Sequence, residues 1–418
     1  MAARYGLIGR TLGHSYSPLI HKLLSGLDYD LVELEPEDVA PFLAGDTWDG
    51  LNVTIPYKKT VTALVDEVTP VAERLGSVNT VVRQTDGTLL GDNTDYAGFS
   101  LLLDTLGIDL MGRSAVVLGG HGGAGTTCMA VLADRGVEAQ AISRSGPVTY
   151  DDLDQYCDVD LVVNATPVGM APACPAAPVD LARFNNLAAV VDIVYNPMRT
   201  GLLLQAERLG IPAVSGLAML VGQAAAAQTR FCGASFSLDD IASVCQRIAQ
   251  REQNIILIGM PGAGKTRVGQ QIARLLGRAH VDADWELEKR LDTTCSEFIT
   301  THGEEAFRVE ETATLRSLGA RSGLVISCGG GCVTRPENYD LMHQNGIIVL
   351  LDRKLEELSS KGRPFSERDG VEALAQARMP LYRAWADMIM PSQSTAEATA
   401  QGVVEHLELN DTAAASTC

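Results

Sequence analysis

The chain has 418 residues, 46% hydrophobic and 20% charged, an ordinary composition for a folded protein of two or three domains. The formal net charge of −19 argues against a general binder of nucleic acid or anionic membranes, so small anionic substrates need arginines and lysines of their own. The nine cysteines include no C-x-x-C pair, no apolar signal segment follows Met1, and polar residues and proline interrupt the least polar stretch, 211–227. These features predict a cytoplasmic protein with free thiols and no membrane span.

Over residues 1–100, short apolar runs alternate with turn signals and helix starts. Strands are predicted at 5–8, 31–34, 51–55 and 78–82. Ser17 followed by Pro18 predicts the beginning of a helix, with the serine as its cap. Asp86 followed by Gly87 predicts a hairpin turn. Strands that alternate with helices indicate an α/β domain.

A glycine-rich turn, GHGGAG at 120–125, separates a predicted strand at 114–118 from a helix that ends near Asp134. The order strand, glycine turn, helix, strand is the one that a dinucleotide fold requires for the pyrophosphate. The second strand, 139–143, leads into Arg144 at the point where NAD-binding proteins have a carboxylate for the ribose. An arginine there suits a 2′-phosphate and favours NADP over NAD; its alternative role is that of a solvated loop cation.

The next predicted elements are strands at 161–164 and 189–193 and helices at 201–209, 217–230 and 238–251. The last of these helices lies at the joint between the two halves of the chain.

The pattern G-x-x-x-x-G-K-[ST] occurs at 259–266, between a buried strand predicted at 254–258 and a helix predicted at 268–276. Its glycines let backbone N–H groups turn toward an anion, and the helix directs its positive end to the same point. We expect Lys265 to reach the β- and γ-phosphates of a nucleotide and Thr266 to hold Mg²⁺. The alternative is a glycine-rich turn that binds no nucleotide.

Several separated motifs lie in the first 245 residues: GHSYSP at 13–18, NVTIPYK at 52–58, SVNT at 77–80, GDNTD at 91–95, NATPVGM at 164–170 and GLAMLVGQ at 216–223. With these motifs, residues 1 to about 245 resemble shikimate dehydrogenase over their whole length. The resemblance implies a first domain that binds a hydroxy-acid ring, a middle domain that binds the cofactor, and last helices that return to the first domain.

The resemblance also implies roles for individual residues. Lys58 and Asp95 resemble the catalytic pair, and the chemistry agrees, because ketone reduction needs a donor at the developing alkoxide and a lysine held by a carboxylate supplies one. Proton transfer by Lys58 and charge stabilisation alone both fit the sequence. The residues implied for substrate binding are Ser15, Ser17, Thr54, Asn79, Asp95, Tyr195 and Gln223. Those implied for NADP binding are Gly120, Gly122, Gly123, Ala124, Ser143, Arg144, Ser145, Gly216 and Met219.

The second half carries further motifs beside the P-loop: VDAD at 281–284, GEEAFR at 303–308, GGG at 329–331, GRP at 362–364 and RMPLY at 378–382. With them, residues 254 to about 408 resemble shikimate kinase. In this resemblance Asp282 reaches Mg²⁺ through water, Asp284 orients the acceptor hydroxyl and takes its proton, and Arg363 closes a lid over the phosphates.

The remaining kinase residues follow from the same resemblance. Arg308 and Arg378 are the implied clamps on the acceptor carboxylate, a task for which guanidinium's paired donors are well suited. The residues implied for ATP are Gly259, Gly262, Ala263, Gly264, Lys265, Thr266 and Arg363. Those implied for the acceptor are Asp284, Arg308, Gly329, Gly330, Gly331 and Arg378, and those for metal are Thr266 and Asp282.

Together the halves predict an α/β protein in which a two-domain dehydrogenase with a Rossmann-type NADP domain precedes a P-loop domain like that of nucleoside-monophosphate kinases. The predicted segments are a substrate domain (1–100 plus 212–245), an NADP domain (101–211), a linker that overlaps the last dehydrogenase helix (234–253), a kinase domain (254–408) and a flexible tail (409–418). The implied function is bifunctional, because the first half makes shikimate with NADPH and the second phosphorylates it with MgATP.

Two alternatives remain open at the level of sequence. The first half fits an NAD-dependent quinate/shikimate oxidoreductase as well, and one half of the chain fits a nucleotide-binding regulatory module without turnover. The retained Lys58 and Asp95, and Lys265 and Asp284, argue against the regulatory module, which has no need of these groups. The sequence predicts no partner beyond small-molecule substrates and leaves the oligomeric state open.

Overall fold

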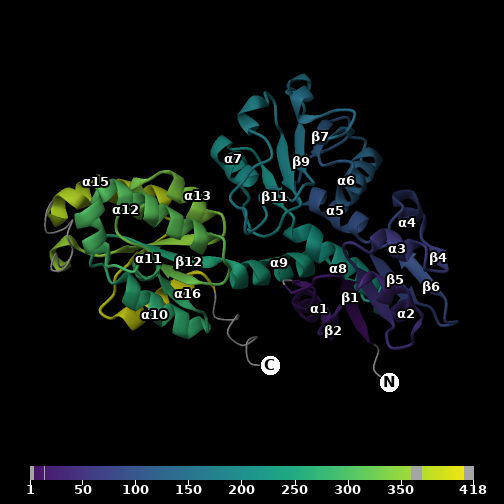
Figure 1. The fold of residues 1–418 in the computed structure, drawn as a ribbon, viewed down its shortest axis with the longest axis horizontal. Coiled ribbons are helices and arrows are strands. Elements are labelled where there is room, and N and C mark those ends of the chain that lie inside the picture. Colours follow the sequence, from purple (N-terminus) through teal and green to yellow (C-terminus); the bar gives the residue numbers. More distant parts are fainter. Residues whose placement is uncertain (1–3, 14, 359–369, 409–418) are drawn as a thin grey trace. The chain divides into compact units, whose positions relative to one another are not determined.

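The computed structural model of the chain describes residues 4–13, 15–358 and 370–408. Its contacts divide the chain into two compact units, each described by itself: 1–167 with 178–195 and 205–246, and 247–418 with 168–177 and 196–204. Helix α9 (Leu238–Glu252), which the sequence predicts at 238–251, runs across the boundary in the chain (Figure 1). The domain limits drawn from the sequence stay predictions.

The first unit begins with a mixed sheet in the order β2-β1-β3-β5-β6-β4. Its strands are β1 (Tyr5–Gly9), β2 (Tyr29–Glu33), β3 (Gly50–Val53), β4 (Glu67–Val68), β5 (Thr80–Arg83) and β6 (Leu89–Asp92). β5 pairs antiparallel with β3 and β6, whereas the other pairings are parallel. The predicted hairpin is confirmed, because Gly87 has φ +90° and its N–H donates to Gln84 O over 2.9 Å.

The helices that follow these strands are α1 (Ser17–Ser25), α2 (Val39–Ala44), α3 (Lys58–Thr62), α4 (Pro70–Leu75) and α5 (Asp95–Asp104). The predicted start of α1 is confirmed, but the predicted serine cap is wrong. Tyr16 occupies the cap position without a side-chain hydrogen bond, and Ser17 is already helical. Its own N–H is instead satisfied by Ser15 Oγ at 3.2 Å.

A late helix, α8 (Leu217–Cys232), packs against these early elements. A β-carbon on Gly98 of α5 would lie only 2.5 Å from Met219 O of α8, so the glycine is what lets the two helices meet. Near the other end of α8, the Phe231 ring stacks on Tyr5 of β1 at 5.2 Å between centroids. Residues after 216 therefore complete the core of the first hundred residues.

The second sheet of this unit is parallel and has the order β11-β10-β9-β7-β8. Its strands are β7 (Ser114–Leu118), β8 (Glu138–Ile142), β9 (Leu161–Asn164), β10 (Ala189–Asp192) and β11 (Ala213–Ser215). Helix α6 (Gly123–Asp134) joins β7 to β8, and helix α7 (Gly201–Leu209) follows β10. One core cluster unites buried side chains of β7, β9 and β10 with those of α5 and α6. This is the strand–turn–helix–strand order of a Rossmann-type domain.

The second unit holds a parallel sheet in the order β13-β14-β12-β15-β16. Its strands are β12 (Asn254–Ile258), β13 (His280–Asp282), β14 (Val325–Ser327), β15 (Gly346–Asp352) and β16 (Met388–Pro391). Its helices are α10 (Lys265–Leu276), α11 (Ala283–Leu291), α12 (Cys295–Gly319), α13 (Glu337–His343), α15 (Val371–Trp385) and α16 (Ala396–His406).

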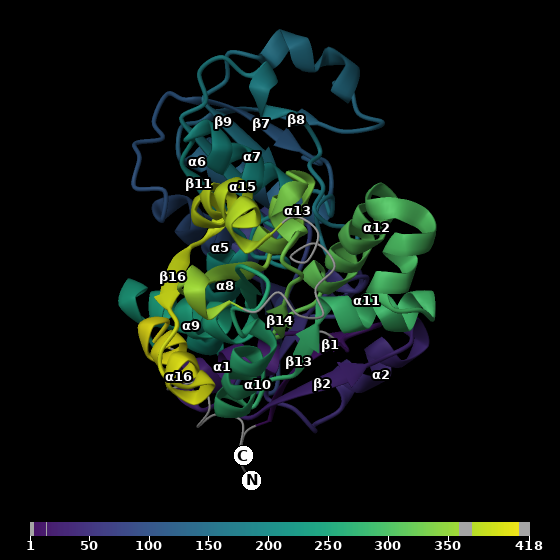
Figure 2. The same ribbon diagram turned by 90° about the vertical axis from the view of Figure 1, so that its left-hand side faces the viewer.

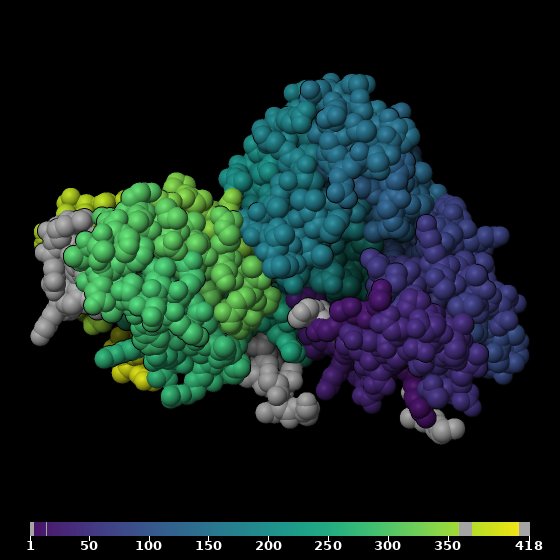
Figure 3. Space-filling model, in the orientation of Figure 1, coloured from purple at the N-terminus to yellow at the C-terminus, as the bar shows by residue number. Residues whose placement is uncertain are grey.

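Helices cover both faces of this sheet. α10 and α16 share one buried cluster with the strands, and α12, α13 and α15 share another, so the sheet lies between two helical layers (Figures 1 and 2). The space-filling view shows α11 and α12, in green, at the surface of the unit (Figure 3). Within the described part of the chain, no helix has both the length and the apolar composition that crossing a bilayer requires.

Candidate active sites

A cavity of about 230 Å³ in the first unit collects the residues predicted for the hydroxy-acid substrate. They come from the starts of α1, α3, α5 and β5, from the segments that follow β3 and β10, and from α8. The predicted residues that line it are Ser15, Ser17, Thr54, Lys58, Asn79, Asp95, Tyr195, Gly216, Met219 and Gln223. Segments as far apart in the sequence as Ser15 and Gln223 thus converge on one cavity, and burial raises the pKa of the Tyr195 phenol at its edge.

Lys58 and Asp95 form an ion pair in this cavity, with 2.5 Å between Lys58 Nζ and Asp95 Oδ2. Their side chains are 30% and 15% exposed, so the pair is partly shielded but still reachable from the cavity. Asp95 is the first residue of α5, where the positive end of the helix dipole stabilises a carboxylate. Lys58 is the first residue of α3, an unfavourable place for a cation that the Asp95 charge offsets.

The glycine turn after β7 brings a strand and a helix into close contact. Helix α6 begins at Gly123, and a β-carbon on Gly125 would lie 2.1 Å from Gly119 O. Gly119 has φ +77°, a left-handed conformation that favours glycine and that the sequence analysis did not single out.

The residues predicted for NADP occupy three regions of the first unit. Gly120 to Ala124 follow β7 and Ser143 to Ser145 follow the adjacent strand β8, so both groups lie at the carboxyl ends of neighbouring parallel strands. Arg144 and Ser145 are exposed there. The structure does not place these two groups in the substrate cavity; of the predicted NADP residues, Gly216 and Met219 line it.

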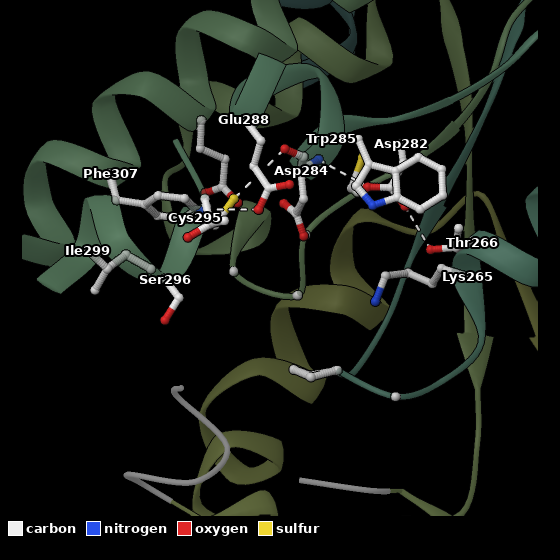
Figure 4. A pocket seen from close by; sticks show the side chains of 18 of the residues that line it. Lys265, Thr266, Asp282, Asp284, Trp285, Glu288, Cys295, Ser296, Ile299 and Phe307 are labelled. Carbon is white, nitrogen blue, oxygen red and sulfur yellow. Dashed lines mark hydrogen bonds between the residues drawn. The ribbon is translucent and has the colours of Figure 1, made fainter. Parts of the chain in front are cut away.

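The second unit contains a larger cavity, of about 730 Å³, above the P-loop (Figure 4). The predicted residues that line it are Gly262, Gly264, Lys265, Thr266, Asp282, Asp284, Arg308, Gly329, Gly330, Gly331 and Arg378. Gly259 and Ala263 belong to the loop but do not line the cavity; Ala263 is packed in the core, and a β-carbon on Gly259, which has φ +141°, would lie 2.8 Å from Leu351 O. Arg363, the predicted lid residue, lies outside the described residues.

The side chains of Lys265 and Thr266 in the P-loop donate hydrogen bonds to neighbouring groups. Lys265 Nζ donates to Gly259 O at 2.8 Å and to Met260 O at 3.1 Å, and burial lowers the Lys265 pKa. Thr266 Oγ1 donates to Asp282 Oδ2 at 2.7 Å, as the dashed line in Figure 4 shows. A hydroxyl beside a carboxylate is an all-oxygen donor pair, which fits Mg²⁺.

Asp284 has the perturbed acid–base behaviour expected of a general base. Desolvation raises its pKa from 3.8 to about 7, and the negative charges of Glu311 and Asp282 act in the same direction. The side chain points into the cavity beside Lys265, which acts in the opposite direction (Figure 4). A carboxylate with a pKa near neutrality is well matched to accept a proton from a hydroxyl.

The three glycines at 329–331 give space to charged side chains. A β-carbon on Gly329 would lie 2.7 Å from Asp284 Oδ1 and 2.9 Å from Glu311 Oε1, and one on Gly331 would lie 2.1 Å from Arg308 Nη1. Arg378 Nη1 donates to Gly330 O at 3.1 Å. The two predicted carboxylate clamps therefore both contact the glycine segment and face the same cavity.

Glu311 is a site residue that the sequence analysis missed. It is 3% exposed and lines the cavity; Oε2 pairs with Arg308 Nη1 at 2.8 Å, and Oε1 has no hydrogen-bond partner within the described chain. Burial raises its pKa, and Arg308 opposes that shift. The signal was the spacing of three residues from Arg308, which places both side chains on one face of a helix.

Tyr382 is a second residue near the site for which the sequence predicted no role. Its side chain is fully buried, and its hydroxyl donates to Gly330 O beside Arg378. Trp285, Glu288 and Cys295 also line the cavity and were not predicted (Figure 4).

The folds and the two sites define the class of the protein: an oxidoreductase with a Rossmann-type domain, joined to a P-loop phosphotransferase. The family model "Shikimate dehydrogenase substrate binding domain" matches residues 7–81, and the model "Shikimate kinase" matches residues 261–408. The shikimate dehydrogenase (NADP(+)) of Moorella thermoacetica is 38% identical over 257 residues, which cover 54% of this chain and 87% of the relative.

Solved structures resemble the same half of the chain. The shikimate 5-dehydrogenase of Thermus thermophilus, in complex with NADP(H) and shikimate, is 32% identical with a TM-score of 0.54, covering 59% of this chain and 99% of its own. The quinate dehydrogenase of Corynebacterium glutamicum, in complex with NAD, is 29% identical with a TM-score of 0.54, covering 58% and 98%.

The chain therefore belongs to the shikimate dehydrogenase family and carries a shikimate kinase domain in its second half. It is a bifunctional enzyme of the shikimate pathway, and the family matches favour catalysis in both halves over the regulatory-module alternative.

Proposed function

We propose that the first unit reduces 3-dehydroshikimate to shikimate with NADPH and that the second phosphorylates shikimate to shikimate 3-phosphate with MgATP. The observation that carries the first activity is the Lys58–Asp95 pair inside a cavity lined by the predicted hydroxyl and amide ligands. The second activity is supported by Asp284 and the two arginines, Arg308 and Arg378, which share one cavity with the P-loop.

In the dehydrogenase, Lys58 acts at the ketone oxygen. NADPH supplies the hydride that reaches the carbonyl carbon. Lys58 Nζ, held by Asp95 at 2.5 Å, donates to the oxygen as negative charge develops there, and so lowers the energy of the alkoxide-like transition state. Ser15 and Ser17, whose hydroxyls lie 3.2 Å apart at the start of α1, bind the substrate carboxylate. These contacts fix the ring relative to Lys58.

In the kinase, the protein positions shikimate and the nucleotide and offsets the negative charge of the phosphates. Arg308 and Arg378 hold the shikimate carboxylate, and Asp284 orients the attacking hydroxyl and accepts its proton. Lys265, whose Nζ now donates to Gly259 O and Met260 O, would offset negative charge on the transferred phosphoryl group. Thr266 and Asp282 would hold Mg²⁺, which neutralises charge on the nucleotide phosphates.

A single incubation tests both activities. The intact chain receives 3-dehydroshikimate, NADPH, ATP and Mg²⁺, and products are identified by mass while NADPH absorbance is followed. Shikimate 3-phosphate is the expected product; shikimate alone would contradict the kinase assignment, and unchanged NADPH would contradict the dehydrogenase assignment. Lys265→Ala is the matched variant, because it should stop the reaction at shikimate and leave NADPH oxidation intact.

An NAD-dependent quinate/shikimate oxidoreductase is the second candidate for the first unit. The likeness to the quinate dehydrogenase of Corynebacterium glutamicum favours it, whereas Arg144 after β8 favours NADP. Steady-state rates with shikimate and quinate, each with NADP⁺ and NAD⁺, separate the two. A higher kcat/KM for quinate with NAD⁺ would replace the first proposal.

We also assign both reactions to the cytoplasm. The cysteines of the described chain are free thiols, which is typical of proteins in a reducing compartment. Fractionation of cells that produce the protein, with both activities measured in each fraction, tests this assignment.

A further inference from the structure

The side-chain amide of Asn79 has a fixed orientation at the wall of the dehydrogenase cavity. Asn79 is 3% exposed and lines that cavity. Its Oδ1 accepts from Thr94 N–H at 2.7 Å, from Thr94 Oγ1 at 3.2 Å and from Thr80 Oγ1 at 3.1 Å. Because a backbone N–H can only donate, the atom that faces it must be the amide oxygen. The Nδ2 group is therefore the end that is left for the cavity.

A second layer of buried groups holds the two threonines. Thr80 and Thr94 are 0% and 3% exposed, and their hydroxyl oxygens lie 3.0 Å apart. Behind them, Asn52 Nδ2 donates to Thr80 Oγ1 at 2.9 Å and to Asn79 O at 3.3 Å. A carbonyl can only accept, so this contact fixes the amide of Asn52 as well. Tyr29 closes the network with a hydrogen bond of 2.7 Å to Asn52 Oδ1.

The amide oxygens of Asn79 and Asn52 both accept hydrogen bonds within this network, whereas the amide N–H donors of Asn79 make none in it. No group in the described part of the chain accepts a hydrogen bond from Asn79 Nδ2, although the residue is almost completely buried. Nδ2 is not among the fully buried side-chain atoms without a partner, and Asn79 lines the cavity, so this donor is available to a ligand bound there.

We propose that Thr80 and Thr94, supported by Asn52, are positioning residues of the dehydrogenase. They lock Asn79 so that its two N–H bonds face the cavity, and the substrate must present a lone pair there, from a ring hydroxyl or a carbonyl oxygen. A substrate group that only donates is rejected at this point, because no acceptor faces it. The inference rests on the proposed dehydrogenase function and adds the reason for the direction of the hydrogen bond.

The test uses Thr80→Val and Thr94→Val in the intact chain, which remove each hydroxyl but keep the shape. Since a neutral hydrogen bond contributes a factor of about 2 to 12 in binding, we expect KM for shikimate to rise about 3- to 10-fold in each variant, with kcat nearly unchanged. Affinity for NADP⁺ and kinase activity should not change. Thr94→Ser should restore KM, and Thr105→Val is the matched control, because its hydroxyl donates to Leu102 O at the far end of α5.

A double-mutant cycle distinguishes positioning from general loosening of the fold. If the threonines act through Asn79, Thr94→Val should have almost no further effect on KM when Asn79 is already alanine. Additive effects would overturn the proposal, and so would unchanged KM values in chains that oxidise shikimate normally. A wild-type chain that neither binds nor oxidises shikimate would instead contradict the proposed function itself.

Asn79→Asp decides the question if either valine variant fails to fold. This substitution keeps an oxygen opposite Thr94 and Thr80 and replaces only the cavity-facing donor with an acceptor. We expect KM for shikimate to rise by about tenfold or more, since a hydrogen bond is then replaced by two facing acceptors. An unchanged KM would overturn the proposal.

Discussion

Arg308 Nη1 and Glu311 Oε2 lie 2.8 Å apart within α12, and their side chains are only 6% and 4% exposed. The pair supports the wall of the kinase cavity, since Arg308 contacts Gly331 and Glu311 lies against Gly329. Burial of two charges is tolerated because each offsets the other, so the loss of one removes the nearest buried countercharge of the second.

Removal of the Glu311 carboxylate should destabilise the kinase unit strongly. Glu311→Ala leaves the Arg308 charge buried, and such a loss costs about 3 to 5 kcal/mol. Urea unfolding, monitored through the loss of kinase activity, measures the change in the free energy of unfolding. Dehydrogenase activity in the same samples serves as the internal reference. Glu304→Ala is the matched control: it removes a 40% exposed partner 3.4 Å from Arg308, and exposed pairs are worth only about 0 to 1 kcal/mol. Equal destabilisation by both variants would contradict this account.

Disruption of the Lys58–Asp95 pair should remove one activity and leave the other. We expect Lys58→Gln and Asp95→Asn to lower the dehydrogenase kcat by about 10²- to 10⁴-fold, because the donor at the developing alkoxide is lost or no longer held. Phosphorylation of added shikimate should continue at the wild-type rate. Lys59→Gln, a change at the adjacent exposed lysine, should affect neither reaction. A Lys58 variant with normal kcat would remove this residue from the catalytic pair.

Replacement of Arg144 should weaken the preference for NADP. Hydrogen bonds to charged groups contribute about 1.5 to 3 kcal/mol, so Arg144→Gln should raise KM for NADP⁺ about 10- to 100-fold. KM for NAD⁺, which lacks the 2′-phosphate, should stay the same and provides the control. If both constants rise together, the arginine contacts a part that the two cofactors share.

The kinase should gain activity as pH rises through the pKa of Asp284, about 7. Asp284 accepts a proton only in its ionised form, so kcat/KM for shikimate should increase up to this pH and then level off. A profile that is flat between pH 5.5 and about 8.5 would argue against Asp284 as the base.

The same carboxyl group should make the ligand-free kinase unit less stable at higher pH. Its folded-state pKa lies above the ordinary 3.8, so the protonated form is favoured by folding; that contribution is complete below about pH 4 and is lost as pH rises through 7. Asp284→Asn should therefore raise the Tm of the kinase unit at pH 8 but not at pH 4, while abolishing turnover. A lower Tm at pH 8 would contradict the sign of the shift.

Local patterns predicted the parts of the sites that depend on neighbouring residues. The P-loop between β12 and α10 and the glycine turn between β7 and α6 are short segments whose spacing dictates backbone geometry, and the structure confirms both elements. The predicted helix at 268–276 begins earlier, at Lys265, so the last residues of the P-loop pattern already belong to the helix.

Contacts between segments that lie far apart in the sequence could not be predicted from local patterns. The partners of Asn79 come from β5 and from the residue before α5, and those of Gly329 come from α11 and α12. No regular spacing of residues along the chain predicts that these side chains meet. The predicted cap at Ser17 failed for a local reason, because the helix begins one residue earlier than expected and the hydroxyl of Ser15 accepts from the Ser17 N–H.

Helix α8 also determines when the amino-terminal core can be completed during translation. Its Phe231 stacks on Tyr5, and its Gln228 donates to His21 O at 3.0 Å, so the earliest strands lack part of their core until residue 232 has left the ribosome. At about 5 to 20 residues per second, the amino-terminal segment waits for more than about ten seconds of translation with apolar surface uncovered. A nascent chain that stalls between β6 and α8 would expose this surface to chaperones, whereas one that stalls after α8 has emerged already carries the contacts of Phe231 and Gln228.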